Sequence, residues 1–379
     1  MAKIQVKVGS SSEQEVSKAV EELQKQLVQE DTTLLLFFAS PQYDPHRLAE
    51  AFKEGFPNTT LMGCSTAGEI TPTGFKQGSV TAMSIASPKI RVAPVVIQDI
   101  LNFKAKEAKS AVEQACNILG VTVDNLKKDR HFGMTLIDGL SAKEEVIIAS
   151  LSMAAPALRI FGGSAADGFS FQKTYLSLNG KVYERSAIFA LFESDIPFKI
   201  IKTEHLVSTG KKMVITKADA STRKVIKING KPARQEYAHL VGVPEEKLSI
   251  EIAQYHPFGF YVGEEPYVRS ISQILEDGSL QFACAIEEGA VVTLMKEGNM
   301  IEDTHQAMEQ IKQELKEISG IIILNCLGRY VASEATGVTE AIFKEYNIGP
   351  IVGFNTYGEQ YGSLHINHTC TGLALGQDA

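Results

Sequence analysis

The chain has 379 residues, of which 44% are hydrophobic and 22% charged, and its formal net charge is −8 at pH 7. This composition is typical of a folded globular protein and excludes an intrinsically disordered one. The negative charge argues against a nucleic-acid partner, because a phosphate backbone attracts basic surfaces. The N-terminus lacks the apolar core of a signal peptide and no apolar run is long enough for a membrane span, so we expect a cytoplasmic protein without membrane contacts.

The chain opens with a predicted strand at Ile4–Val8, followed by a helix that ends near Val28. Ser12 and Glu15 have the spacing of a capping box, in which each side chain bonds a backbone N–H group of the first helical turn. We therefore expect the helix to begin directly after Ser12.

Three later stretches, residues 34–69, 134–168 and 321–359, repeat one order of elements. Each runs from an apolar strand through a helix to a Gly-rich turn, and the first and third turns share the pattern Gly-x-x-Thr-x-Gly-Glu. After each turn the sequence becomes extended again, so the turn joins two strands. A dinucleotide fingerprint needs its glycines at the start of a helix, and this arrangement excludes it.

Repetition of this kind indicates one supersecondary unit that is used several times. Continuous apolar strands separated by a helix are typical of parallel pairing with a crossover. We predict an α/β protein of two domains, built on repeated βαβ-plus-strand units with mixed sheets flanked by helices. Residues 1–31 are expected to pack on the core as a strand and a helix, residues 32–225 to form the first domain, and residues 226–376 to form the second.

The five cysteines are odd in number and show no Cys-x-x-Cys spacing, which argues against a disulfide framework or a structural zinc site. We expect all of them to be reduced: Cys64, Cys116, Cys284, Cys326 and Cys370.

The three Gly-rich turns are expected to meet and to line one cleft. Their glycines allow close approach of a ligand or of another backbone, and their small polar side chains suit a ligand carboxylate. Their acidic side chains are suited to a ligand amine or, equally, to capping of turn amides. The predicted ligand-binding residues are Gly63, Cys64, Ser65, Thr66, Glu69, Gly163, Ser164, Asp167, Asn355, Thr356, Tyr357 and Glu359.

Catalysis is a weaker alternative. Cys64 lies in a tight turn, but no histidine lies in its motif to act as a base. Ser164 does not match Gly-x-Ser-x-Gly and lies between two strands. We therefore expect a binding protein and not an enzyme, with Cys- or Ser-dependent chemistry as the remaining possibility.

Six motifs stand in one order along the chain. They are Gly63-Cys64-Ser65-Thr66-Ala67-Gly68-Glu69-Ile70, Phe161-Gly162-Gly163-Ser164-Ala165, Asn229-Gly230-Lys231-Pro232-Ala233, Tyr255-His256-Pro257-Phe258-Gly259, Val268-Arg269-Ser270 and Gly353-Phe354-Asn355-Thr356-Tyr357-Gly358-Glu359. Together they resemble the FIST family of sensory proteins, in the family's order and over about residues 32–370. The resemblance implies FIST N-terminal and C-terminal domains at residues 32–225 and 226–376, in an intracellular sensor of bacterial signal transduction.

Some stand-alone members of this family are haem-binding nitric oxide sensors that regulate a histidine kinase. The resemblance thus implies a non-covalent haem b and a kinase or cyclic-nucleotide signalling enzyme as partner, and the layout is also compatible with a homodimer. A small polar metabolite such as an amino acid is the alternative ligand.

His256 is the candidate haem ligand, because Pro257 fixes an extended backbone and aromatic residues surround it in sequence. His365 and His368 rank behind it. The family often carries His-Asn-x-Thr near the C-terminus, whereas this chain has Ile366-Asn367-His368-Thr369, so a role for the family histidine does not transfer directly.

Overall fold

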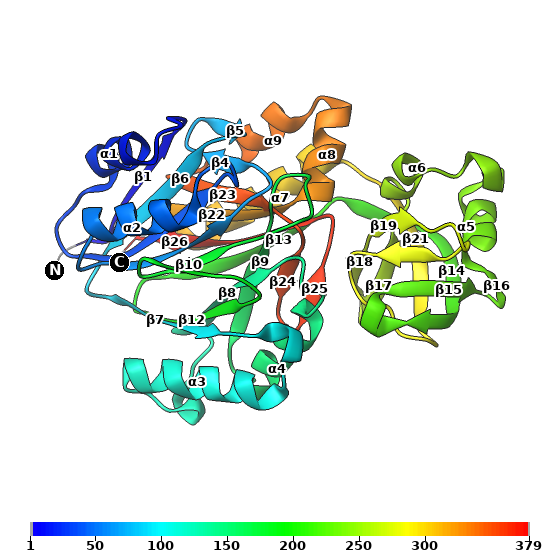
Figure 1. Ribbon diagram of the computed structural model, residues 1–379, viewed down its shortest axis with the longest axis horizontal. Helices are drawn as coiled ribbons and strands as arrows, with labels where there is room; N and C mark the ends of the chain where they lie inside the picture. Colours follow the sequence, from blue (N-terminus) through cyan, green and yellow to red (C-terminus); the bar gives the residue numbers. More distant parts are fainter. Residues whose placement is uncertain (1–2, 378–379) are drawn as a thin grey trace.

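The computed structural model describes residues 3–377, which form three six-stranded sheets, one eight-stranded sheet and the helices that cover them (Figure 1). The three six-stranded sheets make a large lobe. The eight-stranded sheet makes a smaller lobe that lies to the right in Figure 1. The predicted α/β fold class with mixed sheets is confirmed.

The large lobe consists of three copies of one unit. Each copy supplies an edge strand, two parallel strands joined by a crossover helix, a short hairpin and a return strand. The strands of the first copy are β1 (Gln5–Ser11), β2 (Thr32–Ala39), β3 (Thr60–Ser65), β4 (Glu69–Thr71), β5 (Gly74–Lys76) and β6 (Val80–Ala86).

The second and third copies repeat this order. In the second copy the strands are β7 (Ile90–Ile97), β8 (His131–Asp138), β9 (Arg159–Ala165), β10 (Leu176–Leu178), β11 (Lys181–Tyr183) and β12 (Ala187–Ser194). In the third they are β13 (Phe198–Glu204), β22 (Ile318–Cys326), β23 (Ile351–Thr356), β24 (Glu359–Tyr361), β25 (Leu364–Ile366) and β26 (Thr369–Gly376).

The hairpin of each copy pairs with the sheet of another copy. The first hairpin pairs through β4 with β23, the second through β10 with β3, and the third through β24 with β9. Each sheet is therefore completed by strands from elsewhere in the chain. The exchange interlocks the copies and brings the Gly-rich turn that precedes each hairpin toward the centre of the lobe.

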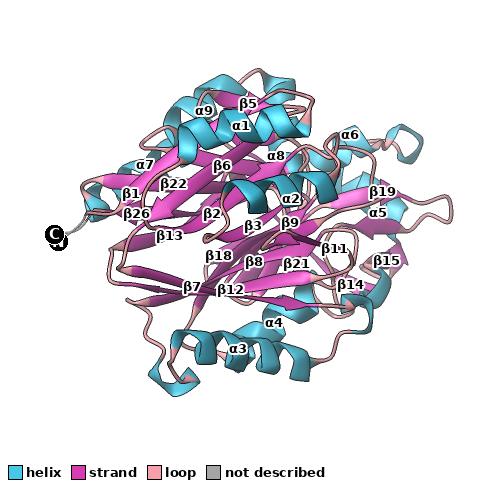
Figure 2. Ribbon diagram, turned by 60° about the vertical axis from the view of Figure 1, so that its left-hand side comes forward, coloured by secondary structure: helices cyan, strands magenta, loops and turns pink. Residues whose placement is uncertain are grey.

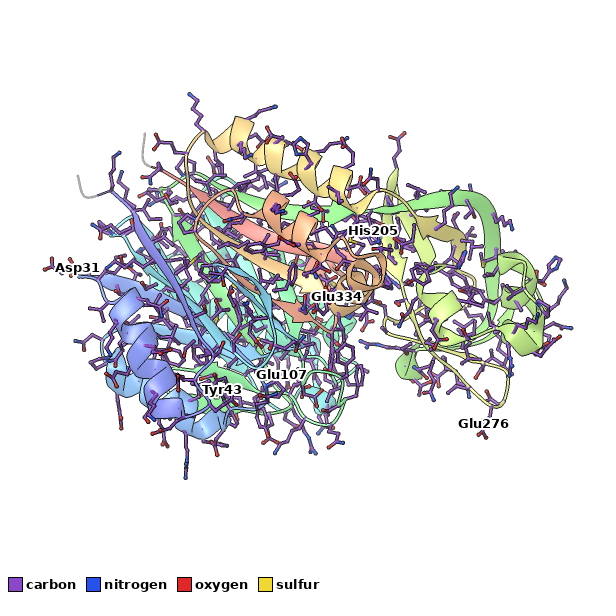
Figure 3. All side chains as sticks on the ribbon, turned by 90° about the horizontal axis from the view of Figure 1, so that it is seen from above. Asp31, Tyr43, Glu107, His205, Glu276 and Glu334 are labelled. Atoms are coloured by element: carbon purple, nitrogen blue, oxygen red, sulfur yellow. The ribbon has the colours of Figure 1, made fainter. Side chains whose placement is uncertain are left out.

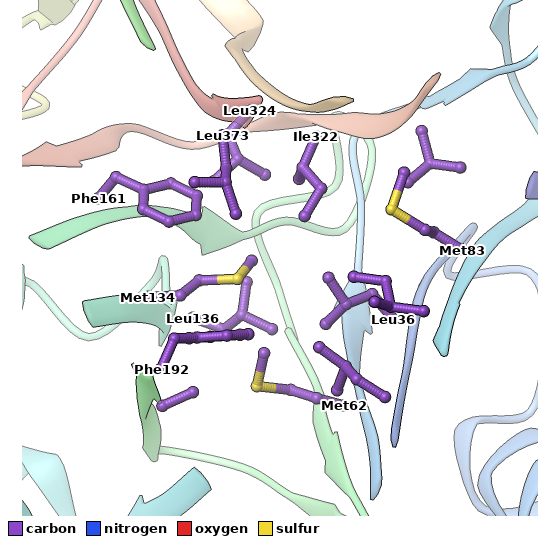
Figure 4. Packing of buried hydrophobic residues seen from close by; sticks show 14 of the residues in the cluster. Leu36, Met62, Met83, Met134, Leu136, Phe161, Phe192, Ile322, Leu324 and Leu373 are labelled. Atoms are coloured by element: carbon purple, nitrogen blue, oxygen red, sulfur yellow. The ribbon is translucent and has the colours of Figure 1, made fainter. Parts of the chain in front are cut away.

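The three sheets share one core. Strand residues alternate between faces, so Leu36, Met134 and Leu324 point inward and pack with their counterparts from the other copies (Figure 4). The opposite faces carry the helices, as Figure 2 shows. These are α1 (Val16–Leu27) and α2 (Pro45–Gly55) on the first sheet, α3 (Ala105–Leu119) and α4 (Glu144–Ala154) on the second, and α7 (Met300–Leu315), α8 (Leu327–Thr336) and α9 (Thr339–Tyr346) on the third.

The capping box expected at Ser12 and Glu15 is not formed. The first helix begins at Val16 with Glu15 at its N-cap and no side-chain cap hydrogen bond. The helix is held instead by its apolar face, since Ala19, Val20 and Leu23 are buried against the sheet.

The small lobe spans residues 206–297, between β13 and α7 of the third copy, and has a hydrophobic core of its own. The boundary expected between residues 225 and 226 lies inside its strand β15. Its elements are β14 (Leu206–Asp219), β15 (Lys224–Ile228), β16 (Lys231–Pro232), α5 (Ala233–Val241), α6 (Ile250–Gln254), β17 (Phe258–Val262), β18 (Glu265–Arg269), β19 (Ile271–Ile274), β20 (Leu280–Phe282) and β21 (Val291–Glu297).

No helix within residues 3–377 has the length and apolar character that crossing a membrane requires.

One glycine recurs at the same position of the second parallel strand in each copy. Gly63, Gly162 and Gly353 pair with Phe37, Thr135 and Ile323 of the neighbouring parallel strand. An added Cβ would lie 2.4, 2.4 and 1.8 Å from the backbone carbonyl oxygens of these partners. These glycines therefore permit close backbone approach.

Replacing Gly353 with alanine is expected to destabilise the chain by about 3 kcal/mol or more, because the new Cβ meets backbone atoms that cannot move independently. Chemical denaturation measures this change. Gly120→Ala is the control, since no atom lies within 4 Å of its Cβ and only its φ of +71° is unfavourable, at about 1–2 kcal/mol. Equal losses in the two variants would contradict the close-approach explanation.

Candidate functional site

The three Gly-rich turns meet at the centre of the large lobe, as the sequence predicts. They contact one another through backbone hydrogen bonds. Each pair of turns shares hydrogen bonds, among them Ala67 N to Asn355 O at 2.9 Å, Ala166 N to Ser65 O at 3.0 Å and Ser164 N to Gly358 O at 2.8 Å.

Two turn carboxylates are fully buried and bind their own turns. Glu69 accepts hydrogen bonds from the Thr66 hydroxyl at 2.5 Å and from the Ser79 hydroxyl at 2.7 Å. Glu359 accepts them from Thr356 and from Thr369, the latter at 2.6 Å. Burial raises the pKa of Glu69 to about 7 and that of Glu359 to about 8. In this structure both side chains hold the turns together.

The small polar residues of the turns are also engaged internally. The Ser65 hydroxyl accepts the Tyr175 N–H at 2.9 Å, and the Ser164 hydroxyl accepts from Gln360 at 3.0 Å. The Asn355 side-chain oxygen accepts from Asn325 at 2.9 Å, while its Nδ2 atom has no partner within the described residues. Ligand binding by these residues stays a prediction.

Gly63 and Gly163 lie where neighbouring groups approach closely, and Cys64 is buried. An added Cβ on Gly163 would lie 2.7 Å from the Thr356 methyl group. Burial raises the pKa of the Cys64 thiol well above its ordinary value. Its reactive thiolate form is therefore disfavoured, which counts against Cys64 as a nucleophile.

A cleft of about 490 Å³ lies beside the turns, between the large and small lobes. Of the predicted ligand-binding residues, Thr356 and Tyr357 line it. The start of α8 forms part of the same wall with Leu327 and Gly328. The small lobe contributes mainly polar side chains, among them Ser270, Ser272 and Gln281. We call this space the interlobe cleft.

The second copy departs from the other two at this cleft. Its connection between turn and hairpin runs from Ser164 to Leu176, whereas the corresponding connection of the first copy runs only from Ser65 to Glu69. The added segment carries two aromatic residues, Phe169 and Phe171, which are 60% and 58% exposed. Both line the interlobe cleft.

Asp167 holds this added segment in place. Its carboxylate accepts hydrogen bonds from the backbone N–H groups of Phe171, Gln172 and Lys173 at 2.7–2.9 Å, and from the Tyr357 hydroxyl. Burial opposes its charge, but these hydrogen bonds keep the pKa of Asp167 below its ordinary value. The Phe171 ring stacks on Tyr357 with centroids 4.7 Å apart. The result is a fixed aromatic surface on one side of the cleft.

His256 does not line the interlobe cleft, and neither does any other histidine. The His256 ring is partly buried at the end of α6, with Nδ1 2.9 Å from the Ile252 carbonyl oxygen. His368 lies behind the cleft wall, against Gly328, and contacts Ser270 at 3.1 Å through Nε2. The residues of the cleft therefore do not supply an imidazole for a haem iron.

Sequence reasoning missed the aromatic segment and the polar wall of the small lobe. The unequal length of the second turn was the available signal for Phe169 and Phe171. Ser270 was noticed only as part of a family motif. Gln281 and Ser272 carry no local signal, because their place in the cleft depends on how the lobes pack.

Two family models together match most of the chain. A family model described as the FIST N domain matches residues 33–231, and one described as the FIST C domain matches residues 233–362. An uncharacterised protein of Methanocaldococcus jannaschii is 23% identical over 371 residues, which covers 90% of this chain and 69% of the relative.

Glu359 links stability to pH. Because its pKa is raised in the folded chain to about 8 from 4.5, its stabilising contribution is complete below about pH 4.5 and is lost as the pH rises towards 8. Glu359→Gln, which stays neutral, is expected to reduce the fall in unfolding temperature between about pH 5 and about pH 8. Glu340→Gln is the control, since the Glu340 side chain is 86% exposed. Parallel curves for wild type and Glu359→Gln would contradict the assignment.

Proposed function

This chain belongs to the FIST family, whose domains are sensory, ligand-binding modules of signal transduction, and we propose that its ligand binds in the interlobe cleft. The observation that carries the proposal is the coincidence of two departures from the threefold repeat. The longer second connection and the inserted small lobe both face this one space. Residues that differ between otherwise equivalent copies are not required by the shared fold, so they indicate where a specific function is located.

The lining indicates the chemistry of the ligand. Phe169, Phe171 and Tyr357 offer apolar and aromatic surface, while Ser270 and Gln281 supply hydrogen-bonding groups on the opposite wall. Such a site suits a small molecule with a flat apolar part and a polar edge. An amino acid with an aromatic side chain fits this description and retains the metabolite alternative of the sequence analysis.

The position of the cleft also suits a sensor, because α8, which forms part of its wall, contacts one of the two chain segments that connect the lobes. The chain leaves the large lobe near His205 and returns after Glu297. The His205 and Glu297 side chains approach to 3.1 Å, and Figure 3 shows His205 beside the junction. Arg329 of α8, next to Gly328 in the cleft wall, donates to His205 Nδ1 at 2.8 Å. A ligand that prefers one position of α8 would thereby shift the relative populations of lobe arrangements.

Thermal unfolding in the presence of amino acids, nucleosides and aromatic metabolites tests the proposal. A cleft ligand at one hundred times its Kd should stabilise the wild type by about 2.7 kcal/mol. Phe171→Ala should weaken that ligand about tenfold, because it removes half of the stacked aromatic pair. Met153→Ala is the control, since Met153 is 80% exposed on α4 and does not line the cleft. Equal stabilisation of wild type and Phe171→Ala would place the ligand elsewhere.

Haem-based nitric oxide sensing with a partner histidine kinase is the second candidate, on the basis of the family resemblance and the His256 segment. The Nδ1 contact with the Ile252 carbonyl oxygen leaves Nε2 of His256 as the atom for iron. Since His256 is outside the cleft, this candidate requires a separate haem site.

The visible spectrum of haem-loaded protein tests this candidate. Haem held by His256 would give a Soret band that shifts with nitric oxide and changes in His256→Ala. His46→Ala serves as the control, because His46 lies at the start of α2, in the other lobe. An identical spectrum in His256→Ala and wild type would exclude His256 as the haem ligand. Protein that retains no Soret band after incubation with haem would exclude haem binding.

A further inference from the structure

A cluster of three ionisable side chains lies at the contact between the lobes. One ligand atom each of Glu145, Cys284 and His365 lies within 4.8 Å of the others. Glu145 belongs to α4 and His365 to β25 of the large lobe, whereas Cys284 follows β20 of the small lobe. Cys284 and His365 are fully buried, and the Glu145 side chain is 25% exposed.

The His365 ring has one nitrogen engaged and one without a partner. Nδ1 lies 3.1 Å from the Glu359 carbonyl oxygen and 3.2 Å from Gln360 Nε2. In the tautomer that donates from Nδ1 to the Glu359 carbonyl oxygen, Nε2 carries the lone pair. It makes no hydrogen bond with any described residue, and it points toward α4, 3.8 Å from Glu144 Oε1. An imidazole that donates through one nitrogen to a backbone carbonyl and presents the other is the usual arrangement of a metal ligand.

The other two copies build the same hairpin without an imidazole at this position. The residues that occupy the position of His365 in the other two hairpins are Phe75 and Val182, which are apolar. Phe75 stacks on Tyr330 with ring centroids 5.4 Å apart. Only the third copy places a polar ring between its hairpin and a neighbouring helix, which here is α4. A buried nitrogen without a partner is unfavourable, so we expect a group that the structure does not contain to accept its lone pair.

The surroundings fix the other two donors. The Ala285 N–H group donates to Glu145 Oε1 at 2.6 Å, and Arg223 binds Oε2 at 2.7 Å. Each carboxylate oxygen retains a further lone pair. The Cys284 thiol lies 2.8 Å from the Asn367 side-chain oxygen. The thiol is the donor in this contact, so it is protonated in the metal-free chain. The donors are thus held in place before any ion arrives.

We propose that Glu145, Cys284 and His365 bind a divalent transition metal ion, with Zn²⁺ as the ion that suits this donor set best. A carboxylate oxygen, a thiolate and an imidazole are ligands that Zn²⁺ takes together, and three of them leave the fourth tetrahedral position free. On binding, the Cys284 S–H bond breaks, its proton passes to water and a metal–sulfur bond forms, with no change in oxidation state. The ion would connect the two lobes behind the interlobe cleft, because its ligands come from both.

Cobalt(II) binding to the chelator-treated full chain tests the proposal. The wild type should bind one Co²⁺ per chain with a sulfur-to-cobalt charge-transfer band, which Zn²⁺ abolishes by displacement. Cys284→Ser should lose the band, and His365→Gln should weaken Co²⁺ at least tenfold. Cys116→Ala, which removes a buried thiol on α3 outside the cluster, should bind as the wild type does.

A further variant separates loss of a ligand from loss of the fold. Glu145→Gln keeps the size of the side chain but loses the ion pair with Arg223, so its unfolding temperature in chelator should be lower than that of the wild type. It should still be folded in chelator, as circular dichroism checks, while its Co²⁺ affinity falls at least tenfold. Wild-type protein that binds no Co²⁺, a charge-transfer band that persists in Cys284→Ser, or unchanged affinity in a folded Glu145→Gln would each overturn the proposal.

Discussion

The pairing of each hairpin with the sheet of another copy is the constraint on which the rest of the structure depends. A strand edge exposes backbone groups that need partners, and in this chain β4, β10 and β24 cover the edges of β23, β3 and β9. Because the exchange is cyclic, no copy can complete its sheet alone. The three turns must then meet, and their backbones hydrogen-bond at the centre. The buried carboxylates Glu69 and Glu359 each hold the turn of their own copy.

The three turns hydrogen-bond to one another at the centre, and both of the proposed sites lie where the copies differ. The interlobe cleft lies at one such place, where the second copy carries extra residues and the third carries the inserted lobe. The cluster of Glu145, Cys284 and His365 lies at another, where an imidazole replaces an apolar side chain. Both lie at the junction between the lobes. Events at either place would therefore bear on the same relative arrangement of the two lobes, which is what a sensory module requires.

Much of the fold was accessible from sequence because its signals are local. The order of strand, helix and Gly-rich turn predicted for residues 34–69 is the observed order of β2, α2 and the turn after β3. The repeated turns were found by comparison of the chain with itself. The capping box at Ser12 failed because the position of the first helix is decided by burial of its apolar face. Of the predicted ligand-binding residues, Thr356 and Tyr357 line the interlobe cleft, whereas Gly63 and Gly163 lie where neighbouring groups approach closely.

The sequence by itself determined that three similar units exist, that their turns join strands and that the chain carries the motifs of one sensory family. Periodicity and turn chemistry act over a few residues, so they can be read without coordinates. Only the tertiary structure decided that the turns close on one another and that the open space lies between the lobes. It also decided that Cys284 and His365, 81 positions apart in the chain, face the same point. Such contacts depend on which strand pairs with which, and backbone pairing between distant segments leaves no pattern in either segment alone.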